Sequence, residues 1–499
     1  MLHVMRLRSQ WLMVLLLIPG VARILPAATS PYVFAPSGIG IDDSVALRNA
    51  LITYRWVQIH GSDIQIDQPI DLDDANGNPL DGLVLEPTAS FTKVTVHTKM
   101  TRNPKNCGDT SRAPFTFEGQ YTPGSYLTSA ANVGDRAILV QDPASIAHTT
   151  FQVGDYIYIN DTQICIPPAG SPSCPSLGPA DGTAELRQVT AMSNGAQQQT
   201  LHLSLDRPLR RAHSPYIIVA HCKVIKNVIF RNLGFTTDYD PSAPSVGPFA
   251  PIHLHLALNA QLIRITTRNW AGLGGPWLDG GGRENIIRSS FSTGLATISQ
   301  PPPGTPCAPI LNAWGIATEG QEDTSIIDSG ASYFNAGIVI TYSYGTKAFN
   351  STVSFAQSDG LAVVHDFKGF PSINSGFVGG TVYGGGLGVY VGICQGCTVS
   401  VDIQGAYSGI AVAGSYNGHT TAGTTLAGSV VGPTSYGIGL AQDTSGAIPS
   451  TGTSINTLTA CGVRNRFVTL NSSYVPVAPL STGQTASYAT GSIFTNLCL

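Results

Sequence analysis

The sequence has little charge and very little lysine. Charged residues make up 11% of the 499 positions, where a typical globular domain has about 25%. Coiled coils and helical bundles need charged outer faces, so this composition excludes both classes. Only seven of the 26 basic residues are Lys and no basic run stands out, which argues against a nucleic-acid partner. Disorder is also excluded, because a chain that is 42% hydrophobic with a net charge of -4 can bury a core.

Long apolar runs are missing after the N-terminal segment. Arg6 and Arg8 precede an apolar run from Trp11 to Ile18, which Pro19 and Gly20 interrupt. This pattern predicts a secretory signal over residues 1–28, because a membrane anchor needs about 20 apolar residues. We therefore expect a secreted or periplasmic protein with no membrane segment after cleavage.

Glycine is abundant, with 55 residues beside 33 Pro, but it lacks the three-residue period of collagen. A phrase of Gly, then Leu or Ile, then a small residue or Val recurs eight times at spacings of 21 to 28 residues. Its glycines are Gly272, Gly294, Gly315, Gly337, Gly360, Gly386, Gly409 and Gly437. A period of this length indicates a solenoid, and the short alternating runs between the phrases indicate strands. The pattern predicts a parallel β-helix with the recurring Gly at a sharp corner of each coil.

The predicted fold class is all-β: a right-handed parallel β-helix solenoid with an N-terminal capping helix and a small antiparallel β insertion. The helix is expected over 42–54, where apolar residues have helical spacing. The predicted divisions are 29–124 for the cap and first coils, 125–215 for the β-rich insertion, 216–460 for the parallel β-helix and 461–499 for a C-terminal cap. Two Gly-Asp turns in the insertion, at Gly134 and Gly154, each lead into an alternating run.

Nine cysteines occur, so at least one is unpaired within a monomer. Cys165 and Cys174 bracket a Pro- and Ser-containing loop and predict a local disulfide. Cys394 and Cys397 form a CxxC that could be a redox pair or half of a zinc site. No second CxxC accompanies it, so a turn with a local disulfide or two free thiols is favoured.

At two places the sequence resembles the right-handed parallel β-helix superfamily of pectate lyases and related polysaccharide enzymes. The segment Ile41 to Ser44, with Leu47 and Leu51, resembles its N-terminal cap, and Lys226 to Phe235 resembles its typical rung. The resemblance covers most of residues 38–460 and implies a secreted, carbohydrate-directed protein, often a lyase, hydrolase or epimerase.

Departures from the superfamily prevent any catalytic residue from being carried over. The Gly-His-Gly and Arg-Ile-Lys motifs of polygalacturonases are absent. The Tyr-Gly-x-Asp-Pro-His motif of mannuronan epimerases is absent as well, and residues 238–241 match it only faintly. The candidate site must therefore come from the placement of residues.

Charge is concentrated in the middle coils. Residues 279–328 carry eight charged side chains, whereas residues 370–499 carry four. Counting from the phrase glycines stacks Trp277 with Tyr342 and His365, and Asp279 with Glu322 and Tyr344. The catalytic candidates are Asp279, Glu319, Glu322, Asp323, His365, Asp366 and Lys368. The substrate-binding candidates are Trp277, Arg283, Tyr342, Tyr344, Arg264 and Arg268.

These residue types can act on sugars in two ways. Aromatic faces pack on pyranose rings, and paired carboxylates hydrolyse glycosidic bonds. Glu322 and Asp366 are expected two coils apart, about 9.5 Å from strand spacing, near the upper limit for inversion. Elimination instead needs a base and a cation that neutralises a uronate. Lys368 or Arg283 could be that base.

A Ca²⁺ ion could supply the cation, held by the oxygens of Asp279, Glu319 and Asp323. No other cofactor is indicated, and the metal ligands are otherwise unknown.

A second candidate surface begins after Leu262, where Arg264, Thr266 and Arg268 are expected on one face, suited to carboxylates or sulfates. His253 and His255 alternate in the same way, but zinc needs a third ligand.

The hypothesis that follows is cleavage of an acidic polysaccharide, with β-elimination favoured over hydrolysis. The alternative is a non-catalytic, adhesin-like β-helix that binds glycans. Either protein could be a monomer or a trimer.

Overall fold

The computed structural model describes residues 30–71, 81–100, 113–146, 150–164, 185–195, 199–237, 249–270, 272–294, 313–365, 370–416, 419–432, 435–441, 453–461, 465–471, 476–479 and 489–490. The predicted signal segment 1–28, the Cys165–Cys174 disulfide, Asp366 and Lys368 lie outside these residues.

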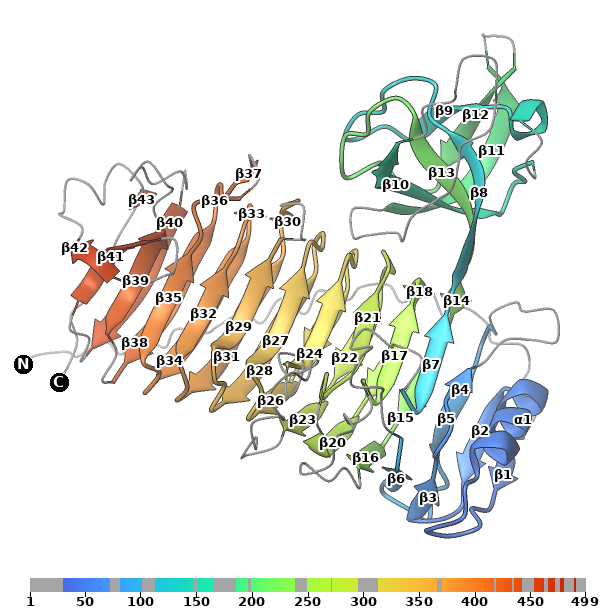
Figure 1. Cartoon of the computed structure of the whole chain (residues 1–499), viewed down its shortest axis with the longest axis horizontal. Helices are drawn as coiled ribbons and strands as arrows, with labels where there is room; N and C mark the ends of the chain where they lie inside the picture. The colour runs from blue at the N-terminus through green and yellow to red at the C-terminus, as the bar shows by residue number, and fades with distance from the viewer. Residues whose placement is uncertain are drawn as a thin grey trace, which may run out of the picture.

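The chain folds as a right-handed parallel β-helix, so the predicted fold class is confirmed. Successive coils stack side by side from the blue to the red end of the solenoid in Figure 1. Two long parallel sheets form its walls, and their inward side chains form one continuous core from Phe34 to Ile455.

Nineteen described strands form the larger sheet: β1 Tyr32–Phe34, β2 Trp56–Ile59, β3 Asp63–Gln65, β5 Val84–Pro87, β6 Val94–Thr98, β15 Ile229–Arg231, β16 Leu233–Thr237, β19 Gln261–Ile263, β20 Thr266–Trp270, β22 Ile286–Arg288, β23 Phe291–Gly294, β25 Ser325–Ile327, β26 Gly330–Ser332, β28 Lys347–Ser354, β31 Gly376–Tyr383, β34 Thr398–Gln404, β38 Thr425–Val431, β40 Thr453–Cys461 and β43 Ala489–Thr490. Most coils cross this sheet twice, because the chain turns a corner between two short strands such as β25 and β26.

Twelve described strands form the second sheet: β4 Ile70–Asp71, β7 Phe115–Glu118, β17 Ile252–His255, β21 Trp277–Asp279, β24 Trp314–Glu319, β27 Ala336–Thr341, β29 Asp359–Val364, β32 Leu387–Val391, β35 Ser408–Val412, β39 Tyr436–Ala441, β41 Asn465–Leu470 and β42 Pro476–Pro479. The remaining short elements are β14 Ile225–Lys226, β18 Ala257–Leu258, β30 Ser372–Ile373, β33 Cys394–Gln395, β36 Ser415–Tyr416, β37 His419–Thr420 and η2 Pro143–Ile146.

The predicted helix is present as α1, Ser44–Tyr54, at the N-terminal end of the stack (Figure 1). Leu47 and Leu51 are fully buried, as their helical spacing predicted. The side chain of Asp42 accepts a hydrogen bond from the backbone N–H of Ser44 at 3.0 Å, next to the first turn.

Five of the eight recurring glycines lie inside strands and do not form corners, so the prediction was wrong for them. Gly315, Gly337 and Gly360 lie inside strands β24, β27 and β29, in register with one another. A Cβ atom on Gly360 would lie 2.5 Å from Val382 and 2.6 Å from the Gly388 carbonyl of the next coil. The glycines recur because each strand packs closely on its neighbour.

Corners are formed instead by residues with left-handed backbone, among them Asn259, Arg264, Asp323 and Asp328. Arg264 has φ 56° and ends the run after Leu262, so Arg264, Thr266 and Arg268 do not share one strand. The predicted alternation was wrong because the chain turns there. Arg264 is exposed at this corner, and Arg268 is exposed on β20 of the larger sheet.

The glycine column predicts a measurable cost. We expect Gly360→Ala to lower the free energy of unfolding by about 1–3 kcal/mol, since the added methyl overpacks a rigid contact. Gly234→Ala is the control, because the nearest atoms to its Cβ would be the end of the flexible Lys93 side chain at 3.0 Å and the Thr266 hydroxyl at 3.1 Å. If urea unfolding showed the same loss of unfolding free energy for both variants, the column glycines would not be required for close strand packing.

A six-stranded antiparallel sheet is inserted between β7 and β14 and is drawn beside the solenoid in Figure 1. We call it the insertion. It comprises β8 Gln120–Tyr126, β9 Ala137–Gln141, β10 Tyr156–Ile164, β11 Glu185–Asn194, β12 Thr200–Leu205 and β13 Ile217–Lys223. The two Gly-Asp turns lead into β9 and β10, as predicted. The insertion has its own apolar core, which includes Val140, Ile157 and Leu203.

Cys394 and Cys397 form a local disulfide that is fully buried in the solenoid core, one of the two outcomes favoured for this CxxC. Cys222 is a free thiol. Among the described residues, the structure contains no helix with the length and apolar character needed to span a membrane.

Candidate active site

Asp279 lies between two histidines on the outer face of the twelve-stranded sheet. It ends β21, whose neighbour β17 places His253 and His255 opposite Trp277 and Asp279. The Oδ1 atom of Asp279 accepts hydrogen bonds from Nε2 of His253 at 3.1 Å and Nδ1 of His255 at 2.8 Å. The alternate residues, such as Leu254 and Leu278, are buried in the core. Strand alternation thus brings this polar cluster to the surface.

Both histidine rings are held by close packing. The ring of His253 stacks on Trp277 with centroids 4.3 Å apart, and Phe249 packs on Trp277 at 4.7 Å. The His255 ring lies over Gly280, where a side chain would overlap it and where φ is +72°. Trp277 is only 8% exposed, so it supports His253 and does not present a face to a sugar, contrary to its predicted substrate-binding role.

Glu319 lies beside Asp279 on the next coil. Leu278 pairs with Thr318, so the following residues, Asp279 and Glu319, end adjacent strands about 4.8 Å apart. Nε2 of Gln321 donates to the carbonyls of both residues at 3.2 Å. The hydroxyl of Tyr342 donates to Oε2 of Glu319 at 3.1 Å. The predicted candidates Asp279, Glu319 and Tyr342 therefore meet in one site.

The environment shifts the pKa values of the two carboxyls in opposite directions. Burial and the nearby charge of Asp279 raise the pKa of Glu319 to about 7. Burial would also raise the pKa of Asp279, but His253 and His255 outweigh it and hold that pKa far below its usual value. Near neutral pH, Asp279 is ionised, whereas Glu319 is close to its pKa and carries a proton in a large fraction of the molecules.

The same interactions act on the neighbouring groups. Burial opposes protonation of His255, but Asp279 outweighs this effect and raises its pKa. Burial and Glu319 raise the pKa of Tyr342 well above its usual value, so this hydroxyl stays protonated.

The cluster of His253, His255 and Asp279 supplies the third donor that a metal site would need. Their ligand atoms lie within 4.8 Å of one another. However, Nδ1 of His253 is buried without a hydrogen-bond partner among the described residues. A metal on Nε2 would place a proton on that Nδ1, and a buried unpaired N–H costs about 1–3 kcal/mol. The geometry fits a carboxylate held by two N–H donors better than a metal.

The predicted Ca²⁺ ligands do not converge, so that prediction was wrong. Asp323 points away from Asp279 and Glu319, toward Nη1 of Arg207 at 3.3 Å and Nη2 of Arg210 at 3.5 Å. Among the described residues, the grouping of possible metal ligands consists of His253, His255 and Asp279.

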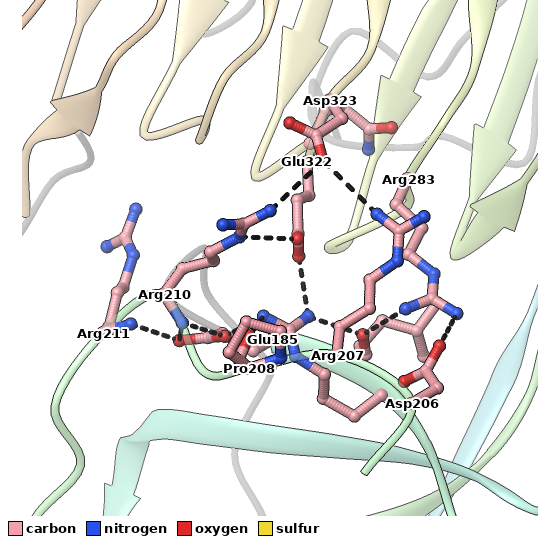
Figure 2. Close-up of polar contacts among 12 residues, drawn as sticks. Glu185, Asp206, Arg207, Pro208, Arg210, Arg211, Arg283, Glu322 and Asp323 are labelled. Atoms are coloured by element: carbon pink, nitrogen blue, oxygen red, sulfur yellow. Dashed lines mark hydrogen bonds and ion pairs between the residues drawn. The ribbon is translucent and has the colours of Figure 1, made fainter. Parts of the chain in front are cut away.

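Glu322 and Asp323 bind the insertion (Figure 2). Glu322 accepts from Nη1 of Arg187 at 2.6 Å and from Nε of Arg210 at 3.1 Å. Arg187 is fully buried and also bonds Glu185. We call these contacts, with those of Arg207 and Arg283, the docking network. They give Glu322 and Asp323 a structural role, and the catalytic role predicted for them stays a prediction.

Arg283 belongs to the docking network as well. Its Nη2 donates to Asp206 of the insertion at 2.5 Å, and its side chain is 4% exposed. Arg283 also precedes Glu322 in a column of bridged residues that continues to Tyr344 and Ile373. The predicted pairing of Glu322 with Tyr344 is confirmed, but Arg283 holds the place expected for Asp279.

A small recess lies between the insertion and the coils next to Glu319. It is lined by Glu185, Arg210, Arg211, Gly281, Gly320, Gln321, Glu322, Tyr342 and Tyr344. The guanidinium of Arg210 lies 4.6 Å from the centre of the Tyr344 ring. The predicted substrate-binding residues Tyr342 and Tyr344 therefore share one recess.

The other predicted residues lie elsewhere. His365 follows β29 and stacks on Tyr416 at 4.4 Å, instead of joining Trp277 and Tyr342. Arg264 lies at a corner and Arg268 on the larger sheet, and the structure does not bring them into contact with Asp279 or Glu319.

Sequence reasoning missed the residues of the insertion that reach this region. Arg187, Glu185 and His213 are buried together, with Nε2 of His213 3.1 Å from Glu185. The available signal was the segment from Arg207 to Arg211, which has three arginines within five residues of a chain with few basic residues.

No family model matches the chain, and no curated protein matches it. Solved structures to which the chain is similar include the following three. The Pseudomonas phage phi297 tailspike gp61 is 9% identical, with a TM-score of 0.48 over 88% of this chain and 72% of that one. PfbA, a surface adhesin of Streptococcus pneumoniae, is 10% identical, with a TM-score of 0.45 over 91% and 96%.

The third is the Gp54 tailspike of the Acinetobacter baumannii bacteriophage AP22, in complex with A. baumannii capsular saccharide. It is 11% identical, with a TM-score of 0.43 over 92% of this chain and 73% of that one. At such low similarity these likenesses carry no argument about function. The fold assignment rests on the strand pairing described above.

Proposed function

We propose that the protein hydrolyses glycosidic bonds of a polysaccharide, with Glu319 as general acid and Asp279 as its ionised partner. One observation carries this proposal: two carboxyls end adjacent coils, Asp279 held by two histidines and Glu319 held by Tyr342. These surroundings shift the two pKa values in opposite directions. Such a separation of pKa values lets a carboxyl pair in a glycosidase divide the roles of acid and nucleophile. Both side chains are partly exposed, so a substrate can reach them.

Each group has a defined step in this reaction. Glu319 donates its proton to the glycosidic oxygen as the bond to the anomeric carbon breaks. The Oδ2 atom of Asp279 adds to that carbon and forms a glycosyl-enzyme ester, because carboxyls on adjacent coils, about 4.8 Å apart, are too close for a water molecule to attack directly. A water molecule then displaces Asp279 from the carbon and gives its proton to the Glu319 carboxylate. Both histidines bind Oδ1 of Asp279, and no described residue makes a hydrogen bond to its Oδ2, the atom that attacks in this scheme.

Hydrolysis has more support than the elimination favoured by the sequence. Of the two bases considered for elimination, Arg283 is buried in an ion pair with Asp206 and Lys368 lies outside the described residues. A protonated Glu319 is suited to protonate a leaving oxygen. Elimination would instead require a base at this position.

The polysaccharide class follows from the resemblance to pectate lyase-like proteins, and its acidic character stays a prediction. Trp314 and Tyr390, both partly exposed, pack with Val339 and Ala362 on the outer face of the twelve-stranded sheet. Such aromatic side chains can contact sugar rings along this face of the sheet. Secretion through residues 1–28 is part of the same proposal.

Incubation with a panel of uronate-containing and neutral polysaccharides tests the reaction. We expect new reducing ends without the ultraviolet absorbance of unsaturated ends, and no need for added Ca²⁺. Unsaturated products would contradict hydrolysis. Glycan binding without any product would instead support the non-catalytic alternative.

The pH dependence of kcat/KM, which reports the pKa values of the free enzyme, should follow Glu319. Because the acid must be protonated, activity should fall as pH rises through about 7, the pKa of Glu319, by about tenfold per pH unit. Asp279 stays ionised far below its usual pKa, so activity should persist toward acid pH. A profile that rises through neutrality, measured on a neutral polysaccharide, would contradict this assignment.

A further inference from the structure

Arg211 connects the insertion to the candidate active site. Its backbone N–H donates to Oε1 of Glu185 at 2.7 Å, which fixes it within the insertion. Its Nη2 donates to the carbonyls of Tyr342 at 2.9 Å and Pro371 at 3.3 Å, both on the solenoid. In Figure 2 its side chain extends away from Glu185 while its backbone stays at the docking network. One residue thus spans the boundary between the two parts.

Tyr342 is held in a backbone conformation that a bulky residue rarely adopts. Its φ is 36°, in the left-handed region that costs about 1–3 kcal/mol for residues other than Gly. Such a conformation persists only where several contacts fix it. Its N–H donates to the Val364 carbonyl at 2.8 Å, and its carbonyl accepts from Arg211. These contacts determine where the hydroxyl meets Glu319.

We propose that Arg211 is a positioning residue for the Tyr342–Glu319 pair, so that the docked insertion completes the active site. This inference rests on the proposed function of Glu319. The docking network holds the Arg207–Arg211 segment against the coils, and Arg211 carries that restraint to the backbone of Tyr342. An undocked insertion would release Tyr342, and its hydroxyl would leave Glu319.

Several charged or titratable groups surround Glu319 and must be considered in any pH test. Asp279 comes from β21, Tyr342 follows β27, and Arg211 comes from the insertion. His255 acts through Asp279, and Glu118 of β7 faces His255. Of these interactions with Glu319, only the hydrogen bond from Tyr342 depends on Arg211. Loss of this hydrogen bond therefore has its own effect on the pKa of Glu319. Because this bond lowers the pKa of Glu319, losing it should move the pKa upward.

Arg211→Ala tests the inference. We expect kcat to fall by about 10²-fold with little change in KM, as displacement of a catalytic group by about 1 Å can produce. The alkaline fall of the pH profile should move to higher pH, as it should in Tyr342→Phe. Arg211→Lys should recover part of both effects. Arg288→Ala, which removes an exposed arginine of β22, should behave as wild type.

Two outcomes would overturn the inference. One is a wild-type pH profile in Arg211→Ala, whatever its stability; the other is a shift in Tyr342→Phe that Arg211→Ala does not share. Infrared difference spectroscopy of the Glu319 carboxyl, referenced to Glu319→Gln, follows its titration without substrate. An upward shift in a protein that cleaves nothing would support the role of Arg211 and refute the proposed function. If the protein is active but Arg211→Ala leaves the Glu319 titration unshifted, the role of Arg211 is refuted and the proposed function is supported.

Discussion

Glu319→Gln is expected to lower kcat by about 10²–10⁴-fold, the contribution of a positioned general acid. The amide keeps the shape of the side chain and can still accept a hydrogen bond from Tyr342, but it cannot give up a proton. KM and the affinity for oligosaccharides should therefore change little. Steady-state kinetics on the polysaccharide that wild type cleaves provides the measurement.

Asp402→Asn is the matched control for this variant. Asp402 is an exposed carboxylate of β34 whose Oδ1 accepts from Ser429 at 2.6 Å, on the other sheet. It makes the same change from a carboxyl to an amide away from the site. If both variants kept wild-type kcat, Glu319 would not be the general acid.

Arg187→Met is expected to lower the free energy of unfolding by about 3–5 kcal/mol, the cost of leaving a buried ion pair without one partner. Arg187 is fully buried and bonds both Glu185 and Glu322, which are 4% and 8% exposed. Its removal leaves two buried carboxylates short of positive charge. Urea unfolding measures the loss, and proteolysis within the insertion reports whether it undocks.

The control for Arg187 is Arg207→Ala. Arg207 pairs with Glu284 and Asp323, but its side chain is 28% exposed and theirs are 43% and 39%. Pairs of this kind contribute about 0–1 kcal/mol. If Arg187→Met lowers the free energy of unfolding no more than Arg207→Ala does, the docking network does not depend on the buried ion pairs of Arg187.

The fold could be predicted from the sequence because the coils of a solenoid repeat the same local pattern of residues. The helix near Leu47 and the strands after Gly134 and Gly154 appear where the sequence pattern placed them. The register was harder to predict. The phrase at Gly386 is two residues out of register, since Leu361 pairs with Val389. Counting from Gly272 failed because Gly275, three residues later, packs on Gly315.

The candidate site was predictable where it depends on neighbouring coils. Asp279, Glu319 and Tyr342 come from successive coils of one sheet, so their shared region followed from the concentration of charge there. Glu322 and Asp323 looked equally suitable, because their partners Arg187 and Arg210 lie more than 100 positions away. No local sequence pattern predicts which residue of the insertion pairs with which residue of the solenoid. The contact between the insertion and the solenoid decides which acids have buried ionic partners.

A crystal structure of the Glu319→Gln variant with an oligosaccharide of the cleaved polymer is the decisive test of Glu319 as the acid. We expect a glycosidic oxygen within hydrogen-bonding distance of the substituted side chain. We also expect the adjoining sugar ring to lie next to Asp279, with the recess lined by Arg211 and Tyr344 beside it. An oligosaccharide bound elsewhere on the solenoid, with its glycosidic bonds out of reach of residues 279 and 319, would contradict this role of Glu319.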